Sequence, residues 1–198
     1  MHQDTRDQLL ETAKRLFASK GFYGASLANI AEELGLTKQA LLHHFSNKEK
    51  LYGAILQQIS DRMLKTLSSA RDDHAGAEQR LEQALLGLYT MSLAHPHDTR
   101  IIMRELLDSE RRAEEVHSWR LKPFLDTLVE MVREASGSGP LAPREALELV
   151  YPILGGMNFL LVSEVVLTRM YGESTYRAMQ EGYAGQLHEQ VQALVAAL

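Results

Sequence analysis

Residues 26–45 read SLANIAEELGLTKQALLHHF, and this stretch decides the fold. Two short segments with apolar residues at helical spacing flank Gly35, and each begins at a hydroxyl side chain, Ser26 or Thr37. Hydroxyl side chains cap helix N-termini, and glycine readily takes the left-handed conformation that ends a helix. The pattern therefore predicts two short helices joined by a tight turn, a helix-turn-helix.

The second of these helices has one face that suits DNA. Ala40, Leu41 and Phe45 are spaced to pack back on the first helix. This leaves an outward row of mixed chemistry: Thr37, Lys38, Gln39, Leu42 and His43. A glutamine can pair with an adenine edge and a lysine with a guanine edge or a phosphate. We therefore expect this helix to lie in a major groove.

Working outward, the whole chain is predicted to be helical, because Pro and Gly divide it into helix-length blocks without sustained strand-like alternation. The predicted helices cover residues 5–20, 26–34, 37–45, 46–71, 81–94, 99–109, 114–134, 143–171 and 173–198. Ser46 with Glu49 is expected to cap the fourth helix. Pro123 should kink or divide the seventh, and Pro152 or the glycines at 155–156 should bend the eighth. The fold class is all-α, with about nine helices.

Composition narrows the function class. The 198 residues are 45% hydrophobic and carry a formal charge of −5, with no cysteine, so a thiolate nucleophile and a Cys-ligated metal site are excluded. Residues 1–50 hold 7 Lys/Arg against 6 acids, so the first quarter is less acidic than the remainder. The most apolar stretch, 153–168, is interrupted by Gly and Glu and falls short of a membrane span. We expect a cytoplasmic protein without a membrane partner.

The surroundings of the helix-turn-helix resemble a known family. The segments GFYGAS (21–26), IAE (30–32), GLTK (35–38) and LLHHFSNKEKL (41–51) are similar to the TetR/AcrR family of bacterial transcriptional regulators over about the first 55 residues. The resemblance implies a DNA-binding domain at 1–47 and a ligand-binding and dimerisation domain at 48–198. It also implies a homodimer on a palindromic operator and a repressor that a small molecule releases from double-stranded DNA.

The resemblance also assigns DNA contacts. The positions that match operator-binding positions of the family, together with the departure at position 42, are Ser26, Thr37, Lys38, Gln39, Leu42, His43, His44 and Lys48. The family commonly has Tyr at position 42, and Leu42 has no hydroxyl, so a phosphate contact is expected to be lost or replaced by contact with a thymine methyl. Ala28 stands where the family is often polar, which weakens readout from the first helix of the motif.

A ligand pocket is expected among the fifth to eighth helices. Its candidate residues mix aromatic rings, flexible thioethers and an amide: Tyr89, Met103, Leu107, Trp119, Phe124, Met131, Tyr151, Met157 and Asn158. Arg104, Glu105 and Arg120 would add polar contacts if they point inward. This composition favours a small apolar or amphipathic effector, and core packing is the alternative for each residue. No cofactor is expected.

The last two helices are the most apolar and are candidates for the dimer interface. The candidate contacts are Val162, Val165, Val166, Met170, Tyr183, Leu187, Val191 and Leu194. The alternative is that these faces complete the core of a single chain.

Two other function classes compete with a DNA-binding regulator. A metal-dependent helical-bundle enzyme needs two Glu-x-x-His pairs, and Glu114–His117 is the one pair in the sequence. A helical adaptor or ligand-binding protein would lack DNA binding altogether. Neither a Gly-x-Ser-x-Gly elbow nor a phosphate-binding glycine loop occurs, so we expect no catalytic and no metal-binding residues.

Overall fold

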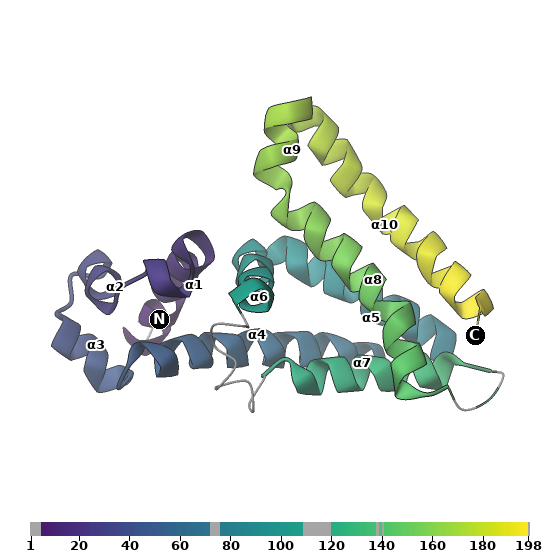
Figure 1. Ribbon diagram of the computed structural model, residues 1–198, viewed down its shortest axis with the longest axis horizontal. Coiled ribbons are helices and arrows are strands. Elements are labelled where there is room, and N and C mark those ends of the chain that lie inside the picture. The colour runs from purple at the N-terminus through teal and green to yellow at the C-terminus, as the bar shows by residue number, and fades with distance from the viewer. Residues whose placement is uncertain (1–4, 72–75, 109–119, 138, 140, 198) are drawn as a thin grey trace. The chain divides into compact units, whose positions relative to one another are not determined.

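The computed structural model describes residues 5–71, 76–108, 120–137, 139 and 141–197 (Figure 1). In these ranges the chain forms helices and no strand, as the sequence predicts. The helices are α1 (Thr5–Gly24), α2 (Leu27–Glu33), α3 (Lys38–His44), α4 (Lys48–Arg71), α5 (Ala77–Ala94), α6 (Pro96–Asp108), α7 (Lys122–Ala135), α8 (Pro143–Val162), α9 (Glu164–Tyr171) and α10 (Glu173–Ala197).

Packing divides the chain into two compact units. The first unit comprises Met1–Asp61 with His97–Leu121, and the second comprises Arg62–Pro96 with Lys122–Leu198. Helix α4 contributes its first half to one unit and its second half to the other. This division by packing differs from the expected boundary at residues 47/48, because α6 and the start of α4 pack with the N-terminal helices.

The first unit is built on aromatic side chains. Phe17 packs edge-on against Tyr52, with ring centroids 5.0 Å apart, and Phe22 lies 5.1 Å from the same Tyr52 ring. All three rings are buried. Gly21 interrupts α1 with φ 73° and ψ 174°, which places Phe22 beyond the kink. The kink at Gly21 directly follows residue 20, where the sequence predicts that the first helix ends.

The cap of α4 differs from the prediction. Asn47, and not Ser46, accepts the first-turn hydrogen bond, through its Oδ1 from the Lys50 amide at 2.8 Å. The helix begins at Lys48, one residue later than a Ser46 cap would require. Asn and Ser are about equally good N-caps, so neighbouring candidates cannot be ranked from sequence.

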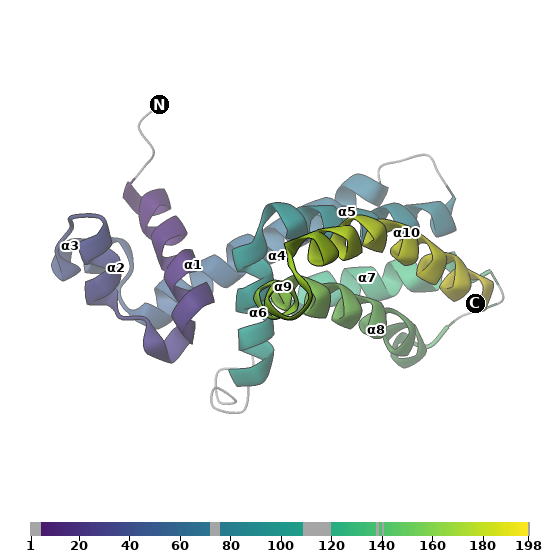
Figure 2. The same ribbon diagram turned by 90° about the horizontal axis from the view of Figure 1, so that it is seen from above.

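The second unit is a helical bundle in which α5, α7, α8 and α10 run side by side (Figure 2). Helix α7 packs on α5 and α8, and α10 packs on α5 and α8. The short α9 joins α8 to α10. The core of this unit is therefore formed by the faces that these four long helices turn toward one another.

The two predicted helices that contain an internal proline have different limits in the structure. The predicted helix at 143–171 is divided at Ser163 into α8 and α9, while Pro152 lies inside α8. No Gly or Pro marks this break, so the sequence could not place it. Of the predicted helix at 114–134, residues 114–119 lie outside the described residues; after a turn at residues 120–121, α7 begins at Lys122, and Pro123 lies in its first turn, where proline is tolerated.

Among the described residues, α8 is the one helix long and apolar enough to cross a membrane by length and composition. A core helix of a bundle meets the same test. Helix α8 buries one side against its neighbours through Ala146, Val150, Ile153, Leu154, Met157 and Leu160.

Candidate DNA-binding site

The turn between α2 and α3 is closed by backbone hydrogen bonds around one glycine. The Gly35 amide donates to the Glu32 carbonyl at 3.0 Å, and the Leu36 amide donates to the Ala31 carbonyl at 2.9 Å. This is the Schellman arrangement, which requires a left-handed residue, and Gly35 has φ 66°. The turn therefore fixes the direction in which α3 leaves α2.

Both short helices are capped as predicted. Ser26 Oγ accepts from the Asn29 amide and Thr37 Oγ1 accepts from the Ala40 amide, each at 3.1 Å. Ile30 and Ala31 of α2 and Leu41 of α3 are buried. Seven-residue helices are marginal alone, so these caps and this small core are what hold α3 in place.

The opposite face of α3 is open. Thr37, Lys38, Gln39, His43 and His44 are exposed, as the sequence predicts. Leu42 differs from them, because it is only half-exposed and so is partly covered by the protein itself. The exposed row offers hydroxyl, ammonium, amide and imidazole groups to a partner. A row of this kind can donate to base edges and to phosphates.

Lys48, at the start of α4, lies against the ring of Phe22. Its Nζ lies 4.5 Å from the centroid of the Phe22 ring. Burial lowers the pKa of the Lys48 ammonium, and the neighbouring Glu49 carboxylate partly opposes that shift. A cation held on an aromatic face keeps a defined position, from which it can meet a phosphate.

Further pairs tie the N-terminal helices together. Arg15 of α1 forms an ion pair with Glu33 of α2. The Arg6 guanidinium lies over the Phe45 ring, 5.1 Å from its centroid. These contacts connect α1 to the helix-turn-helix at two places, Glu33 of α2 and Phe45 after α3.

Comparison with known proteins identifies this arrangement. The family of bacterial regulatory proteins named tetR matches residues 9–55, which contain the whole helix-turn-helix. The chain is 32% identical to the HTH-type transcriptional regulator RutR of Escherichia coli (strain K12) over 145 residues, which is 73% of this chain and 68% of that protein. The chain belongs to the tetR family. It is a DNA-binding transcriptional regulator and not an enzyme.

A second relative and a solved structure are also similar to this chain. The HTH-type transcriptional repressor AcnR of Corynebacterium diphtheriae is 33% identical over 110 residues, covering 53% of this chain and 51% of that protein. The structure of the regulator FadR from Bacillus subtilis, in complex with stearoyl-CoA, superposes with a TM-score of 0.71 at 16% identity. The superposition covers 97% of this chain and 98% of FadR, so the two proteins share a fold along their length.

Metal chemistry finds no support in the described ranges. No group of three or more His, Asp or Glu side chains that could hold a metal ion occurs among the residues the structure places. The Glu114–His117 pair lies outside the described residues.

The predicted ligand-pocket residues divide between the two units. Tyr89, Phe124, Met131 and Met157 are all buried in the second unit, on α5, α7 and α8, which pack on one another. Asn158 is half-buried there, and Tyr151 is exposed. On α6, in the first unit, Met103 is half-buried and Leu107 is 79% exposed. Trp119 lies outside the described residues.

The predicted dimer residues also divide into two groups. Val165, Val166 and Met170 of α9 are exposed, and Val162 is half-exposed. The other four, on α10, are buried within the chain: Tyr183, Leu187, Val191 and Leu194. These four fill the core of the second unit, which is the alternative that the sequence left open.

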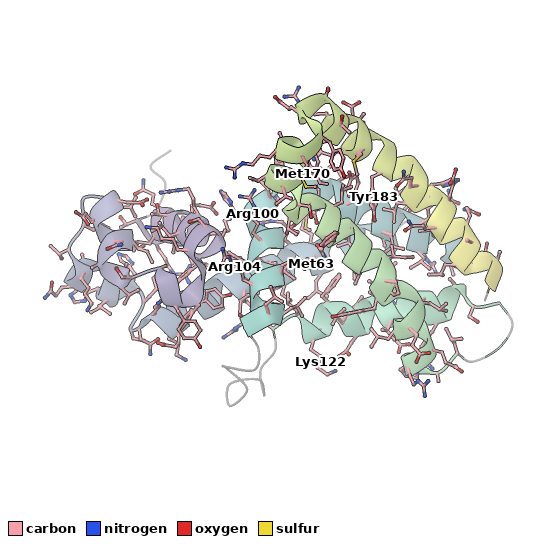
Figure 3. The ribbon with its side chains drawn as sticks, turned by 45° about the horizontal axis from the view of Figure 1, so that its top comes forward. Met63, Arg100, Arg104, Lys122, Met170 and Tyr183 are labelled. Atoms are coloured by element: carbon pink, nitrogen blue, oxygen red, sulfur yellow. The ribbon has the colours of Figure 1, made fainter. Side chains whose placement is uncertain are left out.

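Sequence reasoning missed the role of the polar residues on α6. Arg104 donates from Nε to the Ala18 carbonyl at 3.1 Å and from Nη2 to the Ser19 carbonyl at 2.9 Å, so it caps α1 before the kink (Figure 3). Glu105 accepts from the Tyr52 hydroxyl at 3.0 Å. These residues bond to protein groups more than fifty positions away, and no local pattern signals such partners.

Arg120, another predicted polar contact of the pocket, also bonds to protein groups. Its Nη1 donates to Gln57 Oε1 at 2.9 Å, and its carbonyl accepts from the Ser60 hydroxyl at 2.6 Å. A Cβ at Gly53 would lie 3.2 Å from Nη2 of Arg120, so a larger residue there would require the guanidinium to shift by a few tenths of an ångström. Arg120 therefore fastens the chain beyond α6 to the first half of α4.

Proposed function

We propose that this regulator is a repressor that binds a palindromic operator in the cytoplasm as a homodimer and leaves it when a small molecule binds. The observation that carries the operator-binding role is the open row on α3. Lys38, Gln39 and His43 are exposed, while the opposite side of the same helix is anchored by buried Leu41. A short helix presented in this way can enter a major groove.

Base contacts and backbone contacts are assigned by chemistry. Gln39 is proposed to read a base edge, because an amide can donate and accept together. Lys38 is proposed to contact a guanine edge or a phosphate. Ser26, Thr37, His44 and Lys48 are proposed to contact the backbone, which fixes the position of α3 in the groove.

A second copy of the chain is the proposed partner of the exposed apolar side of α8. Leu147, Tyr151, Gly155 and Phe159 recur every four residues, which places them in one row, and all four are exposed. Phe159 is 69% exposed. Exposed rows of large apolar side chains mark association surfaces, and a two-fold axis lets one such face pair with itself.

Glycines on α10 support the same partner. Gly182 and Gly185 lie inside the helix, are exposed, and have open space where a Cβ would stand. Each costs about 1 kcal/mol of helix stability relative to alanine, so close approach of another helix is a reason to keep them. The row on α8 and the glycines on α10 are proposed to form a four-helix interface with the second copy.

The effector is proposed to bind in the second unit, beside Tyr89, Phe124, Met131 and Met157. Two aromatic rings and two thioethers gathered in one core suit a small apolar or amphipathic molecule, because methionine repacks easily. FadR of Bacillus subtilis, which has the same fold, was solved with stearoyl-CoA. A long-chain acyl compound is therefore a reasonable first probe.

Release from DNA is proposed to pass along α4, which belongs to both units. Its first half carries Lys48 and is fastened to α6 by the bond between Tyr52 and Glu105. Helix α6 is also fastened to α1 through Arg104 and through buried Asp98, whose Oδ1 lies 3.9 Å from Lys14 Nζ. An effector that shifts α4 would thereby change the separation of the two α3 helices, which must be about 34–36 Å to meet successive turns of DNA.

Selection from a random duplex library tests the DNA-binding role. We expect a palindromic consensus, and the affinity for it should fall steeply as salt rises. Gln39→Ala should relax the preference at one base pair per half-site, while Gln57→Ala, on an exposed part of α4, should leave the consensus unchanged. Failure to enrich any sequence would contradict the proposal.

The oligomeric state tests the dimer. Phe159→Glu should give a folded monomer by light scattering, whereas Leu93→Glu on α5 should remain dimeric. A wild-type chain that is monomeric at micromolar concentration would contradict the proposed interface.

Transcription from a reporter carrying the selected operator tests the direction of regulation. Deletion of the regulator should raise expression, and addition of the effector should have the same effect. The opposite response would identify an activator.

A further inference from the structure

One aromatic side chain of the first unit is left in solvent while its neighbours are buried. Tyr23 is 54% exposed, whereas Phe17, Phe22, Phe45 and Tyr52 are all buried. Tyr23 stands just beyond the kink in α1 and three residues before Ser26, the N-cap of α2. An isolated exposed tyrosine is ordinary, so its surroundings decide whether it has a role.

The side chains of Tyr23 and Lys48 both lie against the ring of Phe22. Tyr23 meets the Phe22 ring edge-on, with centroids 5.3 Å apart and planes at 87°. The Lys48 ammonium lies 4.5 Å from the centroid of that ring. A phenol and an ammonium, separated by 25 positions in sequence, are thus brought to one place by a shared neighbour.

The shared ring is itself fixed. Phe22 stacks on Phe17, with centroids 6.0 Å apart, and packs against Tyr52. The Tyr52 hydroxyl is bound to Glu105. Because the Phe22 ring is already held in place, side chains packed on it lose little conformational entropy when they bind a partner.

The charge around this pair favours an anionic partner. Within the described ranges Lys48 has no carboxylate within ion-pair distance, although the whole chain carries a net charge of −5. The Tyr23 hydroxyl likewise has no hydrogen-bond partner among the residues described. A hydrogen-bond donor and a cation held on one ordered aromatic ring can both bind the oxygens of a phosphodiester.

We propose that Tyr23 and Lys48 together hold the DNA phosphate backbone beside the recognition helix, with the Tyr23 hydroxyl donating a hydrogen bond to a phosphate oxygen. This inference rests on the DNA binding described above and extends it to a residue outside the helix-turn-helix. The Phe22 ring positions both groups and does not touch DNA.

The two groups should have different signatures in a salt titration. Tyr23→Phe removes one neutral hydroxyl, and we expect about a tenfold loss of affinity per chain for the selected operator. The slope of log affinity against log salt should stay unchanged, because a neutral group displaces no counterion. Lys48→Met keeps an apolar side chain on the Phe22 ring and should reduce the slope by about one per chain.

Matched controls separate a DNA contact from a structural effect. Tyr171→Phe removes the same hydroxyl from an exposed tyrosine on α9 and should leave DNA affinity unchanged. Tyr23→Phe should melt at the wild-type temperature, because its hydroxyl has no partner in the free protein. An equal loss of affinity in Tyr23→Phe and Tyr171→Phe, or a lowered melting temperature for Tyr23→Phe, would overturn the assignment.

Neutral phosphates locate the contact. We place a methylphosphonate at one backbone position of the operator at a time. At the position that Tyr23 contacts, the substitution should reduce the affinity of the wild-type protein. The affinity of Tyr23→Phe should be the same for this operator as for the unmodified one. If Tyr23→Phe binds the unmodified operator as tightly as wild type, the inference fails while the regulatory function stands. If wild type binds no duplex at all, the proposed operator-binding role fails first.

Discussion

Helices α3 and α10 show two different ways in which this chain stabilises a helix. Helix α3 has seven residues, buries Leu41 and depends on its Thr37 cap and on the Gly35 turn. Helix α10 has 25 residues and buries a stripe along its length. The stripe consists of Tyr176, Tyr183, Leu187, Val191 and Leu194.

The difference has a consequence for function. A helix as short as α3 has no stability of its own, so its position is set by the groups at its ends and by one small core. Its free face can then carry recognition chemistry without loss of stability. Helix α10 buries a longer apolar stripe, and its other face, which carries Gly182 and Gly185, is the one proposed to contact a second copy.

The largest expected effects come from removing a core leucine of each region. Leu41 and Leu187 are both 0% exposed, and truncation of either to alanine should cost about 2–5 kcal/mol of unfolding free energy. Leu41→Ala should abolish operator binding at temperatures where the protein is still dimeric. Leu187→Ala should instead lower the midpoint of global unfolding, measured by urea titration followed by circular dichroism.

These two variants test whether the regions are separable. Val132→Ala on α7, also fully buried, should behave like Leu187→Ala. Loss of the dimer in Leu41→Ala, at the same temperature as loss of DNA binding, would contradict the comparison.

Replacing each of the two positive-φ glycines of the first unit with alanine should lower the free energy of unfolding by a different amount. Gly21→Ala forces a conformation reserved for glycine, with φ 73° and ψ 174°, and places a Cβ 3.1 Å from Nη1 of Arg104. We expect a loss of about 1–3 kcal/mol from strain, in addition to any weakening of the Arg104 cap. Gly35→Ala, at φ 66° with nothing within 4 Å of the new Cβ, should cost about 1–2 kcal/mol.

Thermal unfolding of the two alanine variants measures this difference. Gly21→Asn and Gly35→Asn serve as controls, because asparagine tolerates the left-handed region. Asparagine should recover part of the loss at position 35 and little at position 21. Equal recovery at both positions would show that the Arg104 contact is unimportant.

The first unit could be predicted in detail because its decisive signals are local. Ser26, Thr37 and Gly35 act on backbone groups within a few residues, and each has the predicted role in the structure. The choice between Ser46 and Asn47 as the cap of α4 could not be made, because the two residue types cap about equally well.

For the second unit, the sequence predicts where the helices lie but not what each apolar helix face packs against. Helical periodicity places Tyr183 and Leu187 on one face of α10, and nothing in the sequence says whether that face meets α5 and α8 or another chain. The break at Ser163 carries no Gly or Pro. The contacts of Arg104 with Ala18 and Ser19 join distant positions, so only the folded chain reveals them.

Substitution of Gly185 should change the sign of its effect with the oligomeric state. In the monomeric Phe159→Glu background, Gly185→Ala should raise the unfolding free energy by about 1 kcal/mol, because alanine favours the helix and its Cβ meets nothing. In the wild-type dimer the same Cβ should separate the helices and weaken association, measured by sedimentation equilibrium. A gain in both backgrounds would place the interface elsewhere.

Two neighbouring tyrosines of the second unit should respond differently to loss of a hydroxyl. The rings of Tyr89 and Tyr183 lie 5.0 Å apart, and Tyr89 donates to the Gln180 carbonyl at 2.7 Å (Figure 3 labels Tyr183). The buried Tyr183 hydroxyl has no hydrogen-bond partner among the residues described. Tyr89→Phe should therefore cost about 1 kcal/mol, while Tyr183→Phe should cost nothing or be slightly stabilising.

Urea unfolding of both variants under identical conditions checks this pair. The burial that surrounds these hydroxyls also raises the pKa of Tyr89 to about 12 and the pKa of Tyr183 above its usual value, so both stay protonated at neutral pH. A loss for Tyr183→Phe equal to that for Tyr89→Phe would mean that its hydroxyl is bonded in solution.

The smallest expected effect is a pH dependence that arises from His97 in the first unit. Burial, with Arg100 and Lys14 nearby, lowers the pKa of His97 below 6.5, and Arg15 adds to this while Asp98 opposes it. The folded state therefore takes up this proton less readily than the unfolded chain. Stability that is present above pH 6.5 should be lost as the pH falls toward the lower pKa of the folded state.

Comparison of wild type with His97→Gln isolates this group from every other titrating residue. On moving from above to below pH 6.5, wild type should lose more unfolding free energy than His97→Gln, by a small margin because solvent reaches part of the ring. His188→Gln on α10 is the matched control, and its imidazole pairs with Glu82 of α5. Because His188→Gln leaves His97 in place, it should keep the loss that is attributed to His97 on acidification. Parallel losses in wild type and His97→Gln would mean that His97 titrates alike in the folded and unfolded chains, and the repulsion from Lys14 and Arg100 would then have no energetic consequence.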